Sequence, residues 1–157
     1  VHGGHADEQL MLHDGARDLF ISADQVLPRI SSNIGIFPNR APPDPLADYL
    51  DSLQRLAGLP GDPLVLPSHG RVFRGRRART AELLAHHAEF LGRLLAAADR
   101  PLSAFELSAR LFPQQLDDIN RFMATAETLA HARYLERRGR LDRVADEAGR
   151  DRYLRHA

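Results

Sequence analysis

The sequence predicts a mixed α+β fold, on three observations. Short apolar runs of strand length occur at residues 18–22 and 63–67. Apolar side chains repeat at helical spacing within residues 45–56 and 116–138. Residues 141–154 hold two short strand-like runs around a turn-forming segment. Strands, helices and a final hairpin that are segregated along the chain are typical of α+β proteins rather than of alternating α/β proteins.

Composition narrows the classes of protein to consider. The 157 residues are 43% hydrophobic, enough for the core of one domain or two small ones. Lysine plus arginine equals aspartate plus glutamate at 21 each, so no global basic field indicates a nucleic-acid partner. The absence of cysteine excludes disulfides, thiolate zinc sites and a cysteine nucleophile, and it fits a cytoplasmic setting. The apolar stretches are far shorter than the ~20 residues of a membrane span, so no membrane partner is expected.

The N-terminal part predicts a hairpin and then a long loop. Residues 9–13 and 18–22 are strand candidates, and Asp14-Gly15 between them is a strong turn dipeptide. Five prolines within residues 25–45 exclude regular structure there, and a loop of this length is often functional. A helix is predicted from Pro45 to a stop at Gly58.

The middle of the chain predicts a buried strand followed by a long helix. Residues 63–67 deliver Ser68-His69-Gly70 into a loop. Basic residues fill positions 71–79, where the arginines suit either an anion clamp or a solvated loop. Thr80 is predicted to be the N-cap of a helix that ends near residue 98.

The last third predicts a separate module. Ser103 and Glu106 have the spacing of a capping box, which opens a short helix ending at Phe112. A long helix over residues 116–138 and a hairpin over residues 141–154 follow it. Two helices followed by a two-stranded wing are the element order of a winged-helix module.

Three side chains are candidate metal ligands. His5, Asp24 and His69 stand at the ends of predicted strands or in the adjoining turns. Imidazole and carboxylate groups suit zinc, manganese or iron, and a ligand at a strand end can be held rigidly toward a cleft. The same spacing also fits two turn histidines and a capping aspartate, so spacing alone leaves both interpretations open.

The local sequences around these residues resemble those of the metallo-β-lactamase superfamily. The segment GGHADEQ at residues 3–9 resembles the GHxxxH element. ISADQVLPRISSN at residues 21–33 resembles the strand and turn that supply a bridging aspartate, and LVLPSHG at residues 64–70 resembles the Pro-x-His-Gly element. QVLPRISSN and the segment TAETLAHARYLERRG at residues 125–139 are similar to one branch of hydrolases, which carries an appended C-terminal winged-helix module. The resemblance covers essentially the whole chain.

The resemblance implies a fold, a metal content and ligand roles. Residues 1–98 are expected to form the second half of an αββα sandwich, and residues 99–157 a small winged-helix-like module. A complete site would hold two zinc ions, with Mn²⁺ or Fe²⁺ as alternatives. His5 would bind the first metal and His69 the second, while Asp24 would bridge both.

The resemblance also implies a reaction, and the long loop after Asp24 indicates where the substrate would bind. A metal-activated water would attack an ester, thioester or related bond of a small-molecule substrate. The loop after Asp24 is expected to line the substrate cleft with Arg29, Ser31, Ser32 and Asn33.

The sequence departs from the family pattern in three places. Ala23 stands where the family has a glycine before the aspartate, a change that a negative φ would tolerate. Gln9 replaces the second histidine of GHxxxH. The HxHxDH motif is not found, and since the chain starts at Val1 an upstream part is expected to be absent. The chain alone is therefore predicted to bind metal weakly and to hydrolyse nothing efficiently.

Three functions remain open from the sequence. The first is a metal-dependent hydrolase, or its C-terminal half. The second is a metal-dependent nuclease or nucleic-acid-binding protein that uses the winged-helix module, which the neutral net charge disfavours. The third is a non-catalytic fragment.

Overall fold

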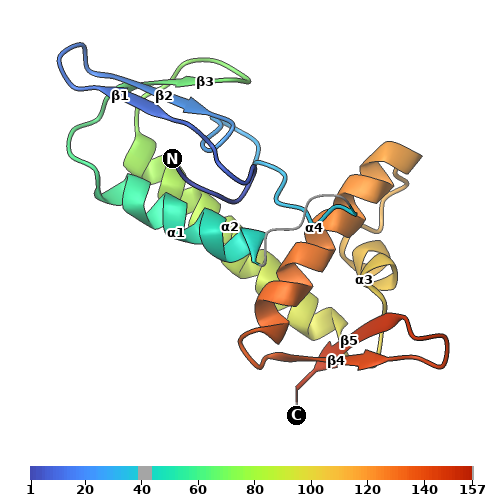
Figure 1. Ribbon diagram of the computed structural model, residues 1–157. Coiled ribbons are helices and arrows are strands. Elements are labelled where there is room, and N and C mark those ends of the chain that lie inside the picture. Colours follow the sequence, from blue (N-terminus) through green and yellow to red (C-terminus); the bar gives the residue numbers. More distant parts are fainter. Residues whose placement is uncertain (39–43, 157) are drawn as a thin grey trace. The chain divides into compact units, whose positions relative to one another are not determined.

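The computed structural model describes residues 1–38 and 44–156 (Figure 1). The chain divides into two compact units, Val1–Ile34 with Pro45–His87 and Gly35–Asp44 with Ala88–Ala157. Helix α2 (Arg76–Ala97) contributes residues to both units. The sequence predicted a domain boundary after residue 98, and that boundary stays a prediction. Residues 39–43 of the predicted loop lie outside the described residues.

The first unit is built on a small mixed sheet. Its strands are β1 (Leu12–Asp14), β2 (Leu19–Ala23) and β3 (Leu64–Pro67), in that order across the sheet. β1 pairs with β2 antiparallel, which confirms the predicted hairpin, and β2 pairs with β3 parallel. A parallel pair needs a crossover connection, and helix α1 (Pro45–Gly58), which is confirmed at its predicted bounds, lies in that connection.

The two faces of this sheet differ in what covers them. α1 and the N-terminal part of α2 lie along one face (Figure 1). Phe20 and Val65, register partners on β2 and β3, are buried, as successive strand residues alternate between faces. The register partners Leu12 and Ile21 remain 54% and 43% exposed. Apolar side chains thus stand in solvent on the other face of the sheet.

Helix α2 begins one turn earlier than the sequence predicted. The expected N-cap, Thr80, lies inside the helix and donates its hydroxyl proton to the carbonyl of Arg77. Instead, the carboxylate of Asp62 accepts hydrogen bonds from the backbone N–H groups of Gly75 and Arg76 at the start of the helix. The N-cap prediction for Thr80 is therefore wrong, because a side chain distant in sequence satisfies the first N–H groups.

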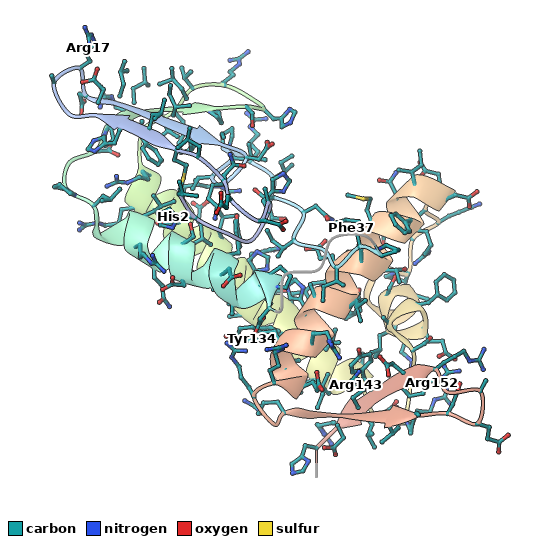
Figure 2. All side chains as sticks on the ribbon, viewed as in Figure 1. His2, Arg17, Phe37, Tyr134, Arg143 and Arg152 are labelled. Atoms are coloured by element: carbon teal, nitrogen blue, oxygen red, sulfur yellow. The ribbon has the colours of Figure 1, made fainter. Side chains whose placement is uncertain are left out.

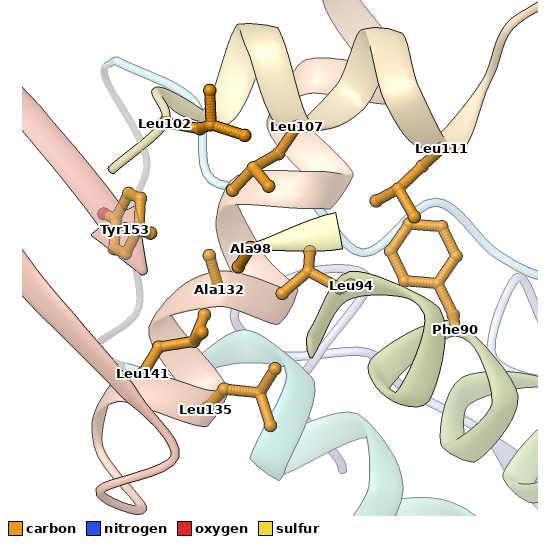
Figure 3. Packing of buried hydrophobic residues seen from close by; sticks show 10 residues of the cluster. All are labelled: Phe90, Leu94, Ala98, Leu102, Leu107, Leu111, Ala132, Leu135, Leu141 and Tyr153. Atoms are coloured by element: carbon orange, nitrogen blue, oxygen red, sulfur yellow. The ribbon is translucent and has the colours of Figure 1, made fainter. Parts of the chain in front are cut away.

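The second unit packs helices against a terminal hairpin. It holds the end of α2 with α3 (Ala104–Leu111), α4 (Asp118–Glu136), β4 (Leu141–Ala145) and β5 (Asp151–Arg155). The predicted capping box is present at α3, between Ser103 and Glu106. Figure 3 shows the core of this unit, which joins all of these elements through the following side chains: Phe90, Leu94, Ala98, Leu102, Leu107, Leu111, Ala132, Leu135, Leu141 and Tyr153.

The hairpin is tied to the rest of the second unit by backbone and ionic contacts. Leu102 and Tyr153 exchange backbone hydrogen bonds, so a short third strand segment pairs with β5. Arg152 on β5 (Figure 2) binds the carboxylates of Asp146 and Glu106. These contacts fix the hairpin against α3.

Only part of the predicted apolar face of α4 is buried. Ala132 and Leu135 pack in the core, but Ile119 and Phe122 in the first turns are 76% and 53% exposed. Phe37 (Figure 2) partly covers Phe122, with ring centroids 5.7 Å apart. Among the described residues, no helix has both the length and the apolar character that crossing a membrane requires.

Candidate metal centre

Asp24 follows the end of β2 at a distorted turn. The register between β2 and β3 shifts between Ile21 and Ala23, and such irregularities re-aim the next side chain. Ala23 has φ of 48°, in the left-handed region that favours glycine. The negative φ that would make alanine harmless there is therefore not adopted, and the methyl group of Ala23 strains the turn that presents Asp24.

The loop after Asp24 is held by buried polar contacts. The backbone carbonyl of Asp24 accepts a hydrogen bond from the hydroxyl of Ser32. Gln25, which is fully buried, donates to the Ser52 hydroxyl on α1 at 2.8 Å and to the Gly3 carbonyl at 3.1 Å. The carboxylate-bearing turn is thus anchored to both α1 and the N-terminal segment.

His5 is oriented from two sides. Gly4 has φ of 117°, and a Cβ added there would lie 2.5 Å from Cβ of Tyr49 on α1, so only glycine permits this approach. The ring Nδ1 of His5 lies 3.0 Å from the carbonyl oxygen of Asn33. A carbonyl can only accept, so Nδ1 carries the proton and the lone pair is on Nε2, the tautomer that suits a metal ligand.

His69 stands in the loop after β3. The preceding residue, Ser68, donates a backbone hydrogen bond to the Ala23 carbonyl at 3.1 Å, and its hydroxyl donates to Oδ1 of Asp24. Gly70 follows with φ of 85°, and a Cβ there would lie 2.7 Å from Cγ of Pro28. The His69 turn is therefore packed directly against the loop that carries Asp24.

The two imidazoles face different oxygens of one carboxylate. Nε2 of His5 lies 3.5 Å from Oδ2 of Asp24, and Nε2 of His69 lies 3.4 Å from Oδ1. The sequence-predicted ligands are thus brought together at one end of the sheet. The His69 side chain is 69% exposed and those of Asp24 and His5 about one third, so the group opens to solvent.

These separations suit ligands that share an ion better than they suit direct hydrogen bonds. Direct N–H···O bonds span about 2.7–3.2 Å. Two ligands that are each about 2.1 Å from one tetrahedral zinc lie about 3.4 Å apart. The His5–Asp24 and His69–Asp24 pairs each have that spacing, and the carboxylate would lie between two ions.

Each such ion would have only two ligands from this chain. Among the described residues, no group of three or more His, Cys, Asp or Glu side chains is arranged to hold a metal ion. The reason is geometric, since His5 and His69 lie at opposite oxygens of Asp24 and do not converge on one point. A catalytic zinc needs three protein ligands and an open position, so the donor types fit the metal but the set is incomplete.

The four residues that the sequence suggested for substrate binding occupy different positions. Arg29 is exposed and lines a cleft of about 550 Å³ beside His69. Ser32 and Asn33 instead hold Asp24 and His5 through the contacts described above. Ser31 is partly buried. A direct substrate role for these residues stays a prediction.

The basic segment after His69 contains two kinds of arginine. Arg74, Arg76 and Arg79 are committed to the fold: Arg74 binds Asp18, and fully buried Arg76 donates to the Leu59 carbonyl. Arg79 donates to the backbone carbonyls of Leu27 at 2.7 Å and Ile30 at 2.9 Å.

Arg71 and Arg77 are exposed and make none of these contacts, whereas Arg74 is exposed but bound to Asp18. The sequence shows a run of basic residues but does not show which arginines hold other loops in place. Their hydrogen bonds go to backbone carbonyl groups that are distant along the chain.

Comparisons with known proteins bear on the fold of the chain. Residues 91–156 match the family described as the metallo-beta-lactamase-like, C-terminal domain. The structure is similar to that of a beta-lactamase domain protein from Burkholderia ambifaria, with 42% identity, a TM-score of 0.91, and coverage of 99% of this chain and 47% of that one. It is also similar to a metallo-beta-lactamase family protein from Thermus thermophilus, with 36% identity, a TM-score of 0.86, and coverage of 98% and 47%. No curated protein matches the chain.

Residues 91–156 are thus similar to a C-terminal metallo-β-lactamase-like domain, and the mixed α+β fold of the chain matches structures of metallo-β-lactamase family proteins. It spans slightly less than half the length of each of these solved chains.

Proposed function

We propose that this chain supplies one half of a binuclear metal site that hydrolyses an ester, thioester or related bond in a small-molecule substrate. The observation that carries the proposal is the pair of separations between the histidine Nε2 atoms and the Asp24 carboxylate, 3.5 Å and 3.4 Å. Both match the spacing of two ligands on one tetrahedral zinc ion. Metal-dependent hydrolysis is also what similarity to metallo-β-lactamase family proteins suggests.

In this proposal each ion takes two ligands from this chain. His5 and Oδ2 of Asp24 hold one, while His69 and Oδ1 of Asp24 hold the other. The remaining ligands come from the half of the fold that corresponds to the part of the solved chains that this chain does not match. Zinc is the metal that the donor set favours, with manganese and iron as alternatives.

The chain's own residues position the ligands. The Asn33 carbonyl holds His5 in the tautomer with a free Nε2 lone pair, and the Ser68 hydroxyl holds one oxygen of Asp24. Bound zinc would supply Lewis acidity and lower the pKa of a bound water toward ~7, which provides a nucleophile at neutral pH. Fixed ligand orientation matters because misplacement by about an ångström costs much of such a rate gain.

The exposed apolar face of the β1–β2–β3 sheet supports a fold in which a second sheet packs on this one. Leu12 and Ile21 are neighbours across β1 and β2, and both are largely exposed. An apolar sheet face of this kind is expected to be covered by another layer. In the αββα arrangement that we propose, a second sheet packs on Leu12 and Ile21 and brings the missing ligands to the same edge.

We further propose that α3, α4 and the β4–β5 hairpin form a winged-helix-like module. The element order and the Leu102–Tyr153 pairing support it. A nuclease that grips RNA through this module is the second candidate function. The ion pairs of Arg133, Arg143 and Arg152 disfavour the nuclease function, because carboxylates already bind these arginines and RNA phosphates would have to displace them.

A Co²⁺ titration tests whether His5, Asp24 and His69, the metal half-site of this chain, bind metal ions. Cobalt reports nitrogen and oxygen ligation through its visible absorption. We expect weak binding to the 157-residue chain, which Asp24→Ala abolishes and which His13→Ala leaves unchanged, since His13 is exposed on β1 outside the site. Unchanged binding in Asp24→Ala would overturn the ligand assignment. Tight uptake of two ions by the chain alone would overturn the proposal that the site is incomplete.

A complementation assay tests the reaction. The chain is mixed with the unmatched half of the Burkholderia ambifaria protein, in the presence of zinc, and thioester hydrolysis is followed. We expect turnover only in the mixture, and none with Asp24→Ala. Equal turnover with Asp24→Ala would refute a catalytic metal site here. Salt-dependent RNA binding by the mixture without thioester turnover would favour the nuclease.

A further inference from the structure

The cleft beside His69 has a basic and apolar lining. It measures about 550 Å³ and is formed by residues 28–30 and 69–73. No acidic residue belongs to either segment, although the chain as a whole is neutral. The cleft is therefore locally positive and directly adjoins one end of the candidate metal centre.

Two guanidinium groups supply the positive charge. Arg29 and Arg71 both line the cleft and are exposed. Neither has a hydrogen bond or ion pair with another described residue, whereas Arg74 and Arg79 in the same region are bound to carbonyl or carboxylate oxygens. Paired arginines that face one cleft without internal partners suit an oxyanion, which they can hold by charge-assisted hydrogen bonds.

The two loops that carry these arginines are fixed relative to each other. Gly70 packs against Pro28 so closely that a Cβ would overlap the proline ring. Arg79 binds the carbonyls of Leu27 and Ile30, on both sides of Arg29. The cleft is therefore a preformed feature of the first unit, which lowers the cost of ordering it around a ligand.

Apolar side chains stand next to the arginines. Ile30 and Val72 line the same cleft and are 62% and 56% exposed. Exposed aliphatic side chains beside a charged pair suit a ligand with an acidic group and an apolar body.

We propose that this cleft binds the acidic end of an anionic small-molecule substrate. Arg29 and Arg71 hold a carboxylate or phosphate group, and Ile30 and Val72 contact its apolar part. The inference rests on the proposed function in one respect, namely that the bond to be hydrolysed then lies toward His69 and Asp24. Anion binding itself requires no metal, so it is measured separately.

The experiment uses the metal-free chain with EDTA and phenyl phosphate as the probe. Amide shifts of Gly70 and Val72 are followed by NMR. We expect saturable shifts, and about tenfold weaker binding for each of Arg29→Gln and Arg71→Gln. Arg77→Gln removes the same charge from an exposed position outside the cleft and is expected to bind as the parent does. Benzyl alcohol, which lacks the acidic group, is expected not to saturate.

Three results would overturn the inference: a double Arg29→Gln, Arg71→Gln variant that binds as the parent does, an equal loss with Arg77→Gln, or equal binding of benzyl alcohol. Failure of the proposed function has a different signature. Co²⁺ binding that is insensitive to Asp24→Ala, together with intact phenyl phosphate binding, leaves an anion site without a metal centre. Benzoate tested in parallel distinguishes carboxylate from phosphate as the preferred group.

Discussion

Glu127 on α4 provides a sharp test of the energetics of the second unit. It lies between two buried residues, Ala126 and Thr128, in the middle of the helix. Burial alone raises the pKa of Glu127 from its ordinary value of 4.5 to about 7. The substitution Glu127→Gln keeps the size and polarity of the side chain but removes its ionisation.

The expected magnitude follows from this pKa. A difference between 4.5 and about 7 corresponds to roughly 3 kcal/mol between the two protonation states. The folded chain binds the Glu127 proton more tightly than the unfolded chain does. Its stabilising contribution is therefore full below about pH 4.5 and is lost as the pH rises through about 7. At about pH 8 we expect Glu127→Gln to be more stable than the parent by up to roughly 3 kcal/mol.

The assay is urea denaturation followed by circular dichroism, for parent and variant, at about pH 4.5 and about pH 8. The difference between the two proteins at each pH isolates Glu127, because all other titrations are common to both. We expect little difference at the lower pH and a clear one at the higher pH. Glu89→Gln is the matched control, since Glu89 is exposed on α2 and loses the same charge.

Two outcomes would refute the reasoning. If Glu127→Gln and the parent differ equally at both pH values, ionisation of Glu127 does not oppose folding. If Glu89→Gln stabilises as much as Glu127→Gln does at the higher pH, the effect is a general change in net charge and burial is not its cause.

Three further substitutions test the packing of the second core, the strained turn at Ala23 and the hydrogen bonds by which Arg79 holds the loop after Asp24. Leu107→Ala, in the fully buried core of the second unit, is expected to lower the free energy of unfolding by about 3 kcal/mol, measured by urea denaturation. Ala23→Gly removes the methyl group at φ of 48° and is expected to raise the free energy of unfolding by about 1 kcal/mol; a lower value would contradict the strain. Arg79→Ala is expected to weaken Co²⁺ binding and to destabilise by about 2 kcal/mol, whereas Arg77→Ala leaves both unchanged.

Much of the fold followed from local patterns in the sequence. The hairpin at Asp14-Gly15, helix α1 with its stop at Gly58 and the capping box at Ser103 each depend on residues near one another along the chain. The start of α2 was mispredicted because its cap, Asp62, lies well before the helix. Local signals are reliable where the stabilising partner is local, and they fail where it is not.

The candidate site shows the same division. His5, Asp24 and His69 could be proposed from their sequence neighbourhoods, and the structure brings them together. The groups that orient them could not be proposed, because a backbone carbonyl at Asn33 and a hydroxyl at Ser68 carry no sequence signal for that role. Such partners are defined by the folded chain path alone.

The metal ligands of this chain are ordered before any metal ion binds. The Asn33 carbonyl, the Ser68 hydroxyl and the close approach of Gly4 to Tyr49 all belong to the first unit, so they orient the ligands when that unit folds. The entropy of ordering His5 and Asp24 is then lost during folding and not on metal binding. A ligand from another layer of the fold would therefore add its coordination bond to a pair of ligands that is already ordered. The affinity for the metal ion should then rise steeply when the first such ligand is added.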